Sequence, residues 1–233
     1  LPRMGEYTLG IERINIELSL RNKIELADAL LAFFERAALP LGPVEDAADR
    51  PGPQAQLERS QQARALIERV RAQWQGWLDS LDGFAAAPSP NVLDTLDALN
   101  ALDGVDGSNG APAERNSFEP LQEQRWRASW KTQIRAPLRA LFTGSVWAPV
   151  LAECEAIHQR VLKGRVWAAL HMHAGDGNVH TNIPVNSDDY AMLQTAHEAV
   201  GRIMALARSL DGVISGEHGI GITKLEYLSE AEL

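Results

Sequence analysis

The sequence predicts an α+β protein in which several long helices cover an antiparallel sheet. Residues 165–185 read as a β-hairpin, and the strict alternation of apolar and polar residues from Arg13 to Leu20 is typical of a half-buried strand. Apolar residues also recur at helical spacing in three long segments. These segments are approximately residues 54–81, 121–162 and 188–210.

We expect one domain over residues 1–233, with a mobile excursion of helix and loop at residues 84–120, where Ala, Asp, Gly, Pro, Asn and Ser dominate. Asn22 and Glu25 resemble a capping box that would begin a helix after the strand at residues 13–20. Trp74 and Trp77 lie at helical spacing, which favours a core position over a cofactor-stacking role.

Composition disfavours several classes of function. The 233 residues carry a formal net charge of −9 and contain no basic run, so binding to nucleic acid or to an anionic membrane is disfavoured. No apolar run approaches the roughly 18–20 residues of a membrane span. The single Cys154 cannot form an internal disulfide and reads as a buried small hydrophobe, which favours a reducing, cytoplasmic compartment.

The hairpin carries the first candidate site. Gly175, Asp176, Gly177 and Asn178 have turn chemistry, and as the loop they would pair Ala174 with Val179. His173 would then face His180, and His171 would face Asn182. Opposed Cβ atoms lie about 4.5–5.5 Å apart, so two imidazoles could reach one metal ion. The hairpin therefore reads as half of a metal site.

A second candidate segment lies near the end of the chain, in the run Gly216-Glu217-His218-Gly219-Ile220-Gly221. Three glycines around an acid and a histidine permit close backbone approach to a ligand. Glu217 could complete a His-His-carboxylate set with one open position, and His218 would lie beside the metal as a base.

The most cationic stretch precedes the hairpin and contains Arg125, Arg127, Lys131, Arg135 and Arg139. It is either an ordinary solvated helix face or the source of one arginine that turns inward to hold a substrate carboxylate at two points. Sequence alone does not select that arginine.

Two motifs, HAGDGNVHTN and GEHGIGITK, closely resemble the C-terminal domain of FAD-linked oxidases. That group holds D-lactate dehydrogenases, D-2-hydroxyglutarate dehydrogenase and the glycolate oxidase D subunit. The resemblance is strong over approximately residues 163–224 and looser over the first 120, where a strand followed by a helix fits a ferredoxin-like substrate domain.

The resemblance implies a role for each motif residue. His173, His180 and Glu217 look like the family's metal ligands, His218 like its catalytic base, and Asn182 like a residue that contacts the substrate. The implied metal is zinc, manganese or iron, and the implied reaction is oxidation of a D-2-hydroxy acid to a 2-keto acid with hydride transfer to FAD. The family's substrate arginine lies in a Trp-Arg-containing helix, for which Arg127 is weakly preferred over Arg125 and Arg135.

The sequence also departs from the family. Nothing in it resembles the domain that holds FAD, and the closing Asn-Pro-Gly-Lys segment is absent. We therefore expect the chain to be a substrate- and metal-binding fragment of a larger flavoenzyme, inactive without the FAD-binding domain of its parent chain.

Three alternatives from other classes remain. A metal-dependent hydrolase would activate water at the open metal position, with His218 or Asp176 as base. An anion-binding module would use residues 175–178 as a backbone nest, although Asp176 argues against an anion there. A non-catalytic module would hold a purely structural metal, although such sites usually close with four protein ligands.

Overall fold

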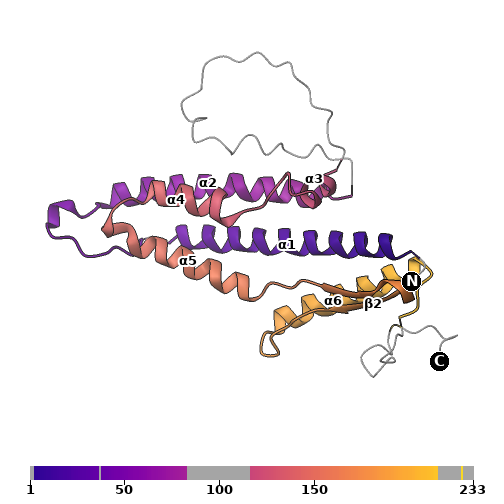
Figure 1. Cartoon of the computed structure of the whole chain (residues 1–233). Coiled ribbons are helices and arrows are strands. Elements are labelled where there is room, and N and C mark those ends of the chain that lie inside the picture. Colours follow the sequence, from indigo (N-terminus) through magenta and orange to yellow (C-terminus); the bar gives the residue numbers. More distant parts are fainter. Residues whose placement is uncertain (1–2, 37, 83–115, 215–226, 228–233) are drawn as a thin grey trace, which may run out of the picture. The chain divides into compact units, whose positions relative to one another are not determined.

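The structure, a computed structural model, describes residues 3–36, 38–82, 116–214 and 227. The chain divides into two compact units, which we call unit 1 (residues 1–19 and 164–233) and unit 2 (residues 20–163). The described part contains helices and one two-stranded antiparallel sheet, which confirms the α+β class (Figure 1). Most of the predicted excursion at 84–120 lies outside the described residues, and its mobility stays a prediction.

The described residues form four long helices, one hairpin and several short helical segments. In chain order they are α1 (Met4–Phe34), η1 (Ala47–Asp49), α2 (Pro53–Asp79), α3 (Phe118–Gln122), the π-helix η4 (Trp130–Arg135), α4 (Ala136–Leu141), η5 (Ser145–Trp147), α5 (Ala148–Lys163), β1 (Ala169–His173), η6 (Ala174–Asp176), β2 (Asn178–Asn182) and α6 (Tyr190–Ser209).

The predicted strand at residues 13–20 is wrong, because this segment lies inside the 31-residue helix α1. Ile14 and Leu18 are buried in the core of unit 1, together with Tyr7 and Ile11 at preceding helical positions. Leu20 is also buried but belongs to unit 2. A helix with apolar residues on more than one side imitates the alternation of a strand, and this is why the pattern misled.

The predicted capping box is wrong for the same reason. Asn22 lies within α1, and its Nδ2 donates a hydrogen bond to the backbone oxygen of Val161 at 3.0 Å. The last helix, α6, is capped by Asp189, whose side chain accepts a hydrogen bond of 2.9 Å from the backbone nitrogen of Met192.

The core of unit 1 is built by the first half of α1, by α6 and by the segment that leads into β1. Val166 and Ala168 are buried with α6 residues such as Ala199 and Ile203. Gly10 allows α1 to approach α6 closely, because a Cβ at this position would collide with the Leu206 side chain. Partly buried residues of the hairpin, Leu170, Val179 and Ile183, pack against the same core.

Polar contacts fix α1 to the start of the hairpin. The Asn15 side chain accepts a hydrogen bond from the Ala168 nitrogen at 2.7 Å and donates one to the Ala168 oxygen at 2.8 Å. It thereby satisfies both backbone groups of a residue beside β1, as a neighbouring strand would. Glu17 is buried and accepts hydrogen bonds from both Nη atoms of Arg202 on α6, at 3.1 and 2.6 Å.

Unit 2 is helical in its described part, and buried aromatic side chains pack together in it. Trp74 and Trp77 of α2 are fully buried, which confirms their predicted core role. The ring of Phe34 stacks on that of Phe142 at 5.7 Å, and Phe142 contacts Trp147 at 5.3 Å. Gln133 in η4 accepts hydrogen bonds from Trp74 Nε1 and from the backbone of Ser129.

Cys154 lies on α5 and is 2% exposed, as the sequence predicts for a small buried hydrophobe. Burial raises the pKa of its thiol to about 12, so the group is protonated and unreactive at neutral pH. None of the helices in the described ranges combines the length and the apolar character that crossing a membrane requires.

The double hydrogen bond of Asn15 should contribute measurably to stability. We expect Asn15→Ala to lower the free energy of unfolding by about 1–3 kcal/mol, because both backbone groups of Ala168 lose their partner in a part-buried place. Urea denaturation measures the change. Gln194→Ala is the matched control, since it removes only an exposed side-chain hydrogen bond on α6 and should change stability by less than about 0.5 kcal/mol. Equal effects would contradict the assigned role of Asn15.

Candidate functional site

The predicted hairpin forms, but its register differs from the predicted one. β1 pairs with β2 so that His171 faces His180 and His173 faces Asn178. The predicted pairs of His173 with His180 and of His171 with Asn182 are therefore wrong. The loop is one residue earlier than predicted and comprises residues 174–177, so Asn178 enters the strand and each residue's partner moves by two positions.

A shift of two residues leaves the side chains on the same face, because side chains alternate along a strand with a period of two. His171, His173 and His180 therefore share one face of the hairpin, which we call the histidine face. Their ring centres lie 5.6 Å apart for His171 and His173, 6.3 Å for His171 and His180, and 5.7 Å for His173 and His180. His171 and His173 are exposed, and His180 is half-buried.

The opposite face of the hairpin fixes this orientation. Leu170, Val179 and Ile183 pack on the core of unit 1, and the Tyr7 hydroxyl lies 3.0 Å from the Thr181 hydroxyl in a hydrogen bond. Burial raises the pKa of Tyr7 above its usual value, so this hydroxyl stays neutral at physiological pH. The apolar face is held inward, and the imidazoles are held outward.

Asn182 belongs to the same surface. It ends β2, pairs with Ala169, and is two residues from His180, so the pleat places it on the histidine face. Its side chain is exposed and offers amide donors beside the imidazoles.

The histidine face carries nitrogen donors of the kind that bind metal ions. Its ring-centre separations are slightly larger than those of two imidazoles on one ion. Two imidazoles that share a tetrahedral ion through bonds of about 2.0–2.1 Å have ring centres about 5 Å apart. The observed separation of 5.7 Å for His173 and His180 exceeds this by an amount that side-chain rotation can close. Within the described residues no group of three or more His, Cys, Asp or Glu side chains is arranged to hold a metal ion.

Glu217 and His218, the predicted third ligand and base, lie outside the described residues. Arg127 belongs to unit 2, is exposed, and donates hydrogen bonds from Nε to the Gln124 backbone oxygen and from Nη2 to Gln124 Oε1. Arg125 pairs with Glu123 at 2.7 Å.

Sequence reasoning did not include His171 in the site. The structure places it directly across from His180, next to both predicted ligands. The signal was available in the spacing of His171 and His173, because residues two positions apart in a strand share a face.

Comparison with known proteins finds similarity to FAD-linked oxidases in the second half of the chain. The sequence profile described as FAD linked oxidases, C-terminal domain, matches residues 124–232. Residues 124–232 are a C-terminal domain of the FAD-linked oxidase family. This segment of the FAD-linked oxidase domain includes the hairpin with the histidine face, and it also includes α4 and α5 of unit 2. The match begins after α1 and α2.

Curated relatives agree with the FAD-linked oxidase assignment. The mitochondrial D-lactate dehydrogenase (cytochrome) 1 of Saccharomyces cerevisiae is 33% identical over 93 residues, which is 39% of this chain and 16% of the relative. The D-lactate dehydrogenase of Archaeoglobus fulgidus is 48% identical over 58 residues, covering 25% and 12% of the two chains. The glycolate oxidase subunit GlcD of Escherichia coli K12 is 41% identical over 56 residues, covering 24% and 11%.

The matched segments thus span less than one fifth of these relatives. No solved structure matches this chain.

The turn of the hairpin depends on Gly177, whose φ of 65° lies in the left-handed region. We expect Gly177→Ala to destabilise the protein by about 1 kcal/mol, because a Cβ disfavours this backbone conformation. Gly175→Ala in the same loop is the matched control, since a Cβ there meets nothing within 4 Å. Chemical denaturation of both variants checks the difference, and equal stabilities would show that the turn relaxes without cost.

Proposed function

We propose that this chain is the substrate- and metal-binding part of a flavin-dependent oxidoreductase that oxidises a D-2-hydroxy acid to a 2-keto acid, with hydride transfer to FAD. The FAD-binding domain then belongs to the same parent chain, and the present chain alone is inactive. The family match and the names of the relatives, D-lactate dehydrogenase and glycolate oxidase subunit, support this reaction class.

The observation that carries the proposal is the convergence of two motif histidines on one exposed face. His173 and His180 come from different strands, and their rings lie 5.7 Å apart on the side of the hairpin that faces away from the core. Imidazoles on the side of a hairpin that faces away from the core are suited to bind a ligand. In this proposal they hold a zinc, manganese or iron ion together with Glu217.

When bound, the divalent metal would supply positive charge beside the substrate hydroxyl group, and FAD would accept the hydride. The chain's own residues bind the substrate and move its proton. A nitrogen of His218 takes the hydroxyl proton as general base. The side-chain amide of Asn182, on the histidine face, contacts the substrate.

Arg127 is proposed to bind the substrate carboxylate. Two of its five N–H donors engage Gln124, and the remaining donors are those a carboxylate would use. The hydrogen bonds to Gln124 hold the guanidinium in a fixed direction, which lowers the entropy lost when a carboxylate binds.

Metal content tests the ligand set. We expect His173→Ala, His180→Ala and Glu217→Ala each to reduce the metal bound by the purified protein by about tenfold or more, because loss of even an outer-sphere partner costs 10–100-fold in affinity. Elemental analysis after equilibration with zinc, manganese or iron measures it. His197→Ala, an exposed histidine on α6, is the matched control and should retain full metal content. Equal metal in all variants would remove the metal site from the proposal.

Flavin reduction tests the reaction. The full-length flavoenzyme should bleach its bound flavin under anaerobic conditions when mixed with a D-2-hydroxy acid such as D-lactate. We expect His218→Ala to slow this step by about 100-fold or more, since general-base catalysis typically contributes 10²–10⁴. His197→Ala again serves as control, with flavin content measured in each variant.

Either of two results would reject these assignments. A His218→Ala variant with unchanged flavin reduction would exclude it as the base. Hydrolysis of an ester by the metal-loaded chain, without flavin, would favour a hydrolase instead.

A further inference from the structure

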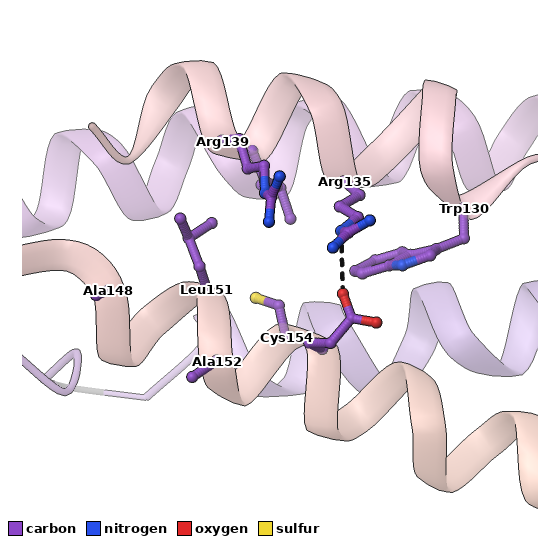
Figure 2. A pocket seen from close by; sticks show the side chains of 9 residues that line it. Trp130, Arg135, Arg139, Ala148, Leu151, Ala152 and Cys154 are labelled. Atoms are coloured by element: carbon purple, nitrogen blue, oxygen red, sulfur yellow. Dashed lines mark ion pairs between the residues drawn. The ribbon is translucent and has the colours of Figure 1, made fainter. Parts of the chain in front are cut away.

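Unit 2 contains a cavity of about 320 Å³ between α4 and α5, a volume in the range of small-molecule sites. Its lining residues include Trp130, Arg135 and Arg139 from the η4–α4 side and Leu151, Cys154 and Glu155 from α5. Figure 2 shows the two arginines extending from one helix toward the facing helix. All of these residues belong to unit 2, and the proposed metal site uses none of them.

The charges around this cavity leave one cation unbalanced. Arg135 forms an ion pair with Glu155, with 3.1 Å between Nε and Oε2 (Figure 2). Arg139 lines the same cavity with an exposed side chain, and it forms no hydrogen bond or ion pair with any residue in the part of the chain that the structure describes. The charged lining residues, Arg135, Arg139 and Glu155, therefore sum to +1, which favours one negative charge in the occupant.

Trp130, another residue of the lining, has a buried polar atom without a partner. The Nε1 of Trp130 is buried without a hydrogen-bond acceptor, although buried indole N–H groups usually find one. One face of the Trp130 ring is covered by His158, because the two rings stack at 4.7 Å with an interplanar angle of 10°. The indole is thus held in place at the cavity wall.

The remaining wall is apolar. Leu138 and Cys154 are buried at the cavity, and Leu151 and Ala152 of α5 complete the lining. A protonated thiol behaves as an apolar group, and the pKa of Cys154 is raised to about 12 by burial. An occupant would therefore bury a hydrocarbon body here while its charged end meets Arg139.

We propose that this cavity binds a small organic monocarboxylate with a short apolar body. The Arg139 guanidinium matches the planar geometry of a carboxylate and can bind it at two points. Glu155 in the same cavity repels a second negative charge, so phosphate and dicarboxylates are disfavoured. This inference does not depend on the proposed metal site or on flavin chemistry.

The indole N–H resonances of the six tryptophans provide a direct test in the full chain. With 4-methylpentanoate as probe, the resonance of Trp130, assigned through Trp130→Phe, should shift and saturate at millimolar concentration. The neutral isostere 4-methylpentanamide and inorganic phosphate should leave it unchanged. We expect Arg139→Gln to weaken binding by about tenfold or more, because a hydrogen bond to a charged group contributes about 1.5–3 kcal/mol.

Two further variants keep the test decisive. Arg125→Gln removes an arginine of the same cationic stretch that is paired with Glu123 outside the cavity, and it should bind as the parent does. Ala152→Phe keeps Arg139 but fills the cavity from an exposed position on α5, and it should abolish the shift. The proposal is overturned by absence of binding, by equal binding of the amide or of phosphate, or by an affinity that Arg139→Gln leaves unchanged.

Discussion

The burial of one face of the β1–β2 hairpin is the constraint on which the candidate site depends. A two-stranded hairpin is marginal in water unless a hydrophobic face packs against other elements. Here Leu170, Val179 and Ile183 pack on a core made by α1 and α6. Because side chains alternate along a strand, this packing places the imidazoles of His171, His173 and His180 on the outside. The same constraint explains why a two-residue shift in register left the face intact.

The first half of α1 supports the hairpin from outside the family-matched segment. The match covers residues 124–232, whereas Tyr7 and Asn15 bind Thr181 and Ala168 from the beginning of the chain. The Asn15 amide occupies the place that a third strand would take beside Ala168. The α1 segment therefore helps to form the site, although the family profile does not include it.

The arginines of the cationic stretch before the hairpin differ in their interaction partners. Arg125 and Arg127 engage Glu123 and Gln124 close in sequence, and Arg135 reaches Glu155 across to α5. Arg139 has the same charge but lines a cavity whose other walls are apolar. Its side chain is exposed like those of Arg125 and Arg127, so the apolar wall beside it is what sets it apart. Charge alone thus does not distinguish these arginines, and their surroundings do.

Local sequence determined the elements whose signals are short in range: the hairpin with its glycine turn, the helices α2 and α6, the core tryptophans, and the two motifs that resemble FAD-linked oxidases. Only tertiary structure decided that residues 13–20 are helical, because α1 buries different sides in two units and so imitates a strand. It also decided the register that sets His171 across from His180, since the position of a four-residue loop depends on backbone angles such as the φ of Gly177. Alternation along a strand is a local property, whereas the partner of each residue is fixed by the turn and by the core on which the hairpin packs.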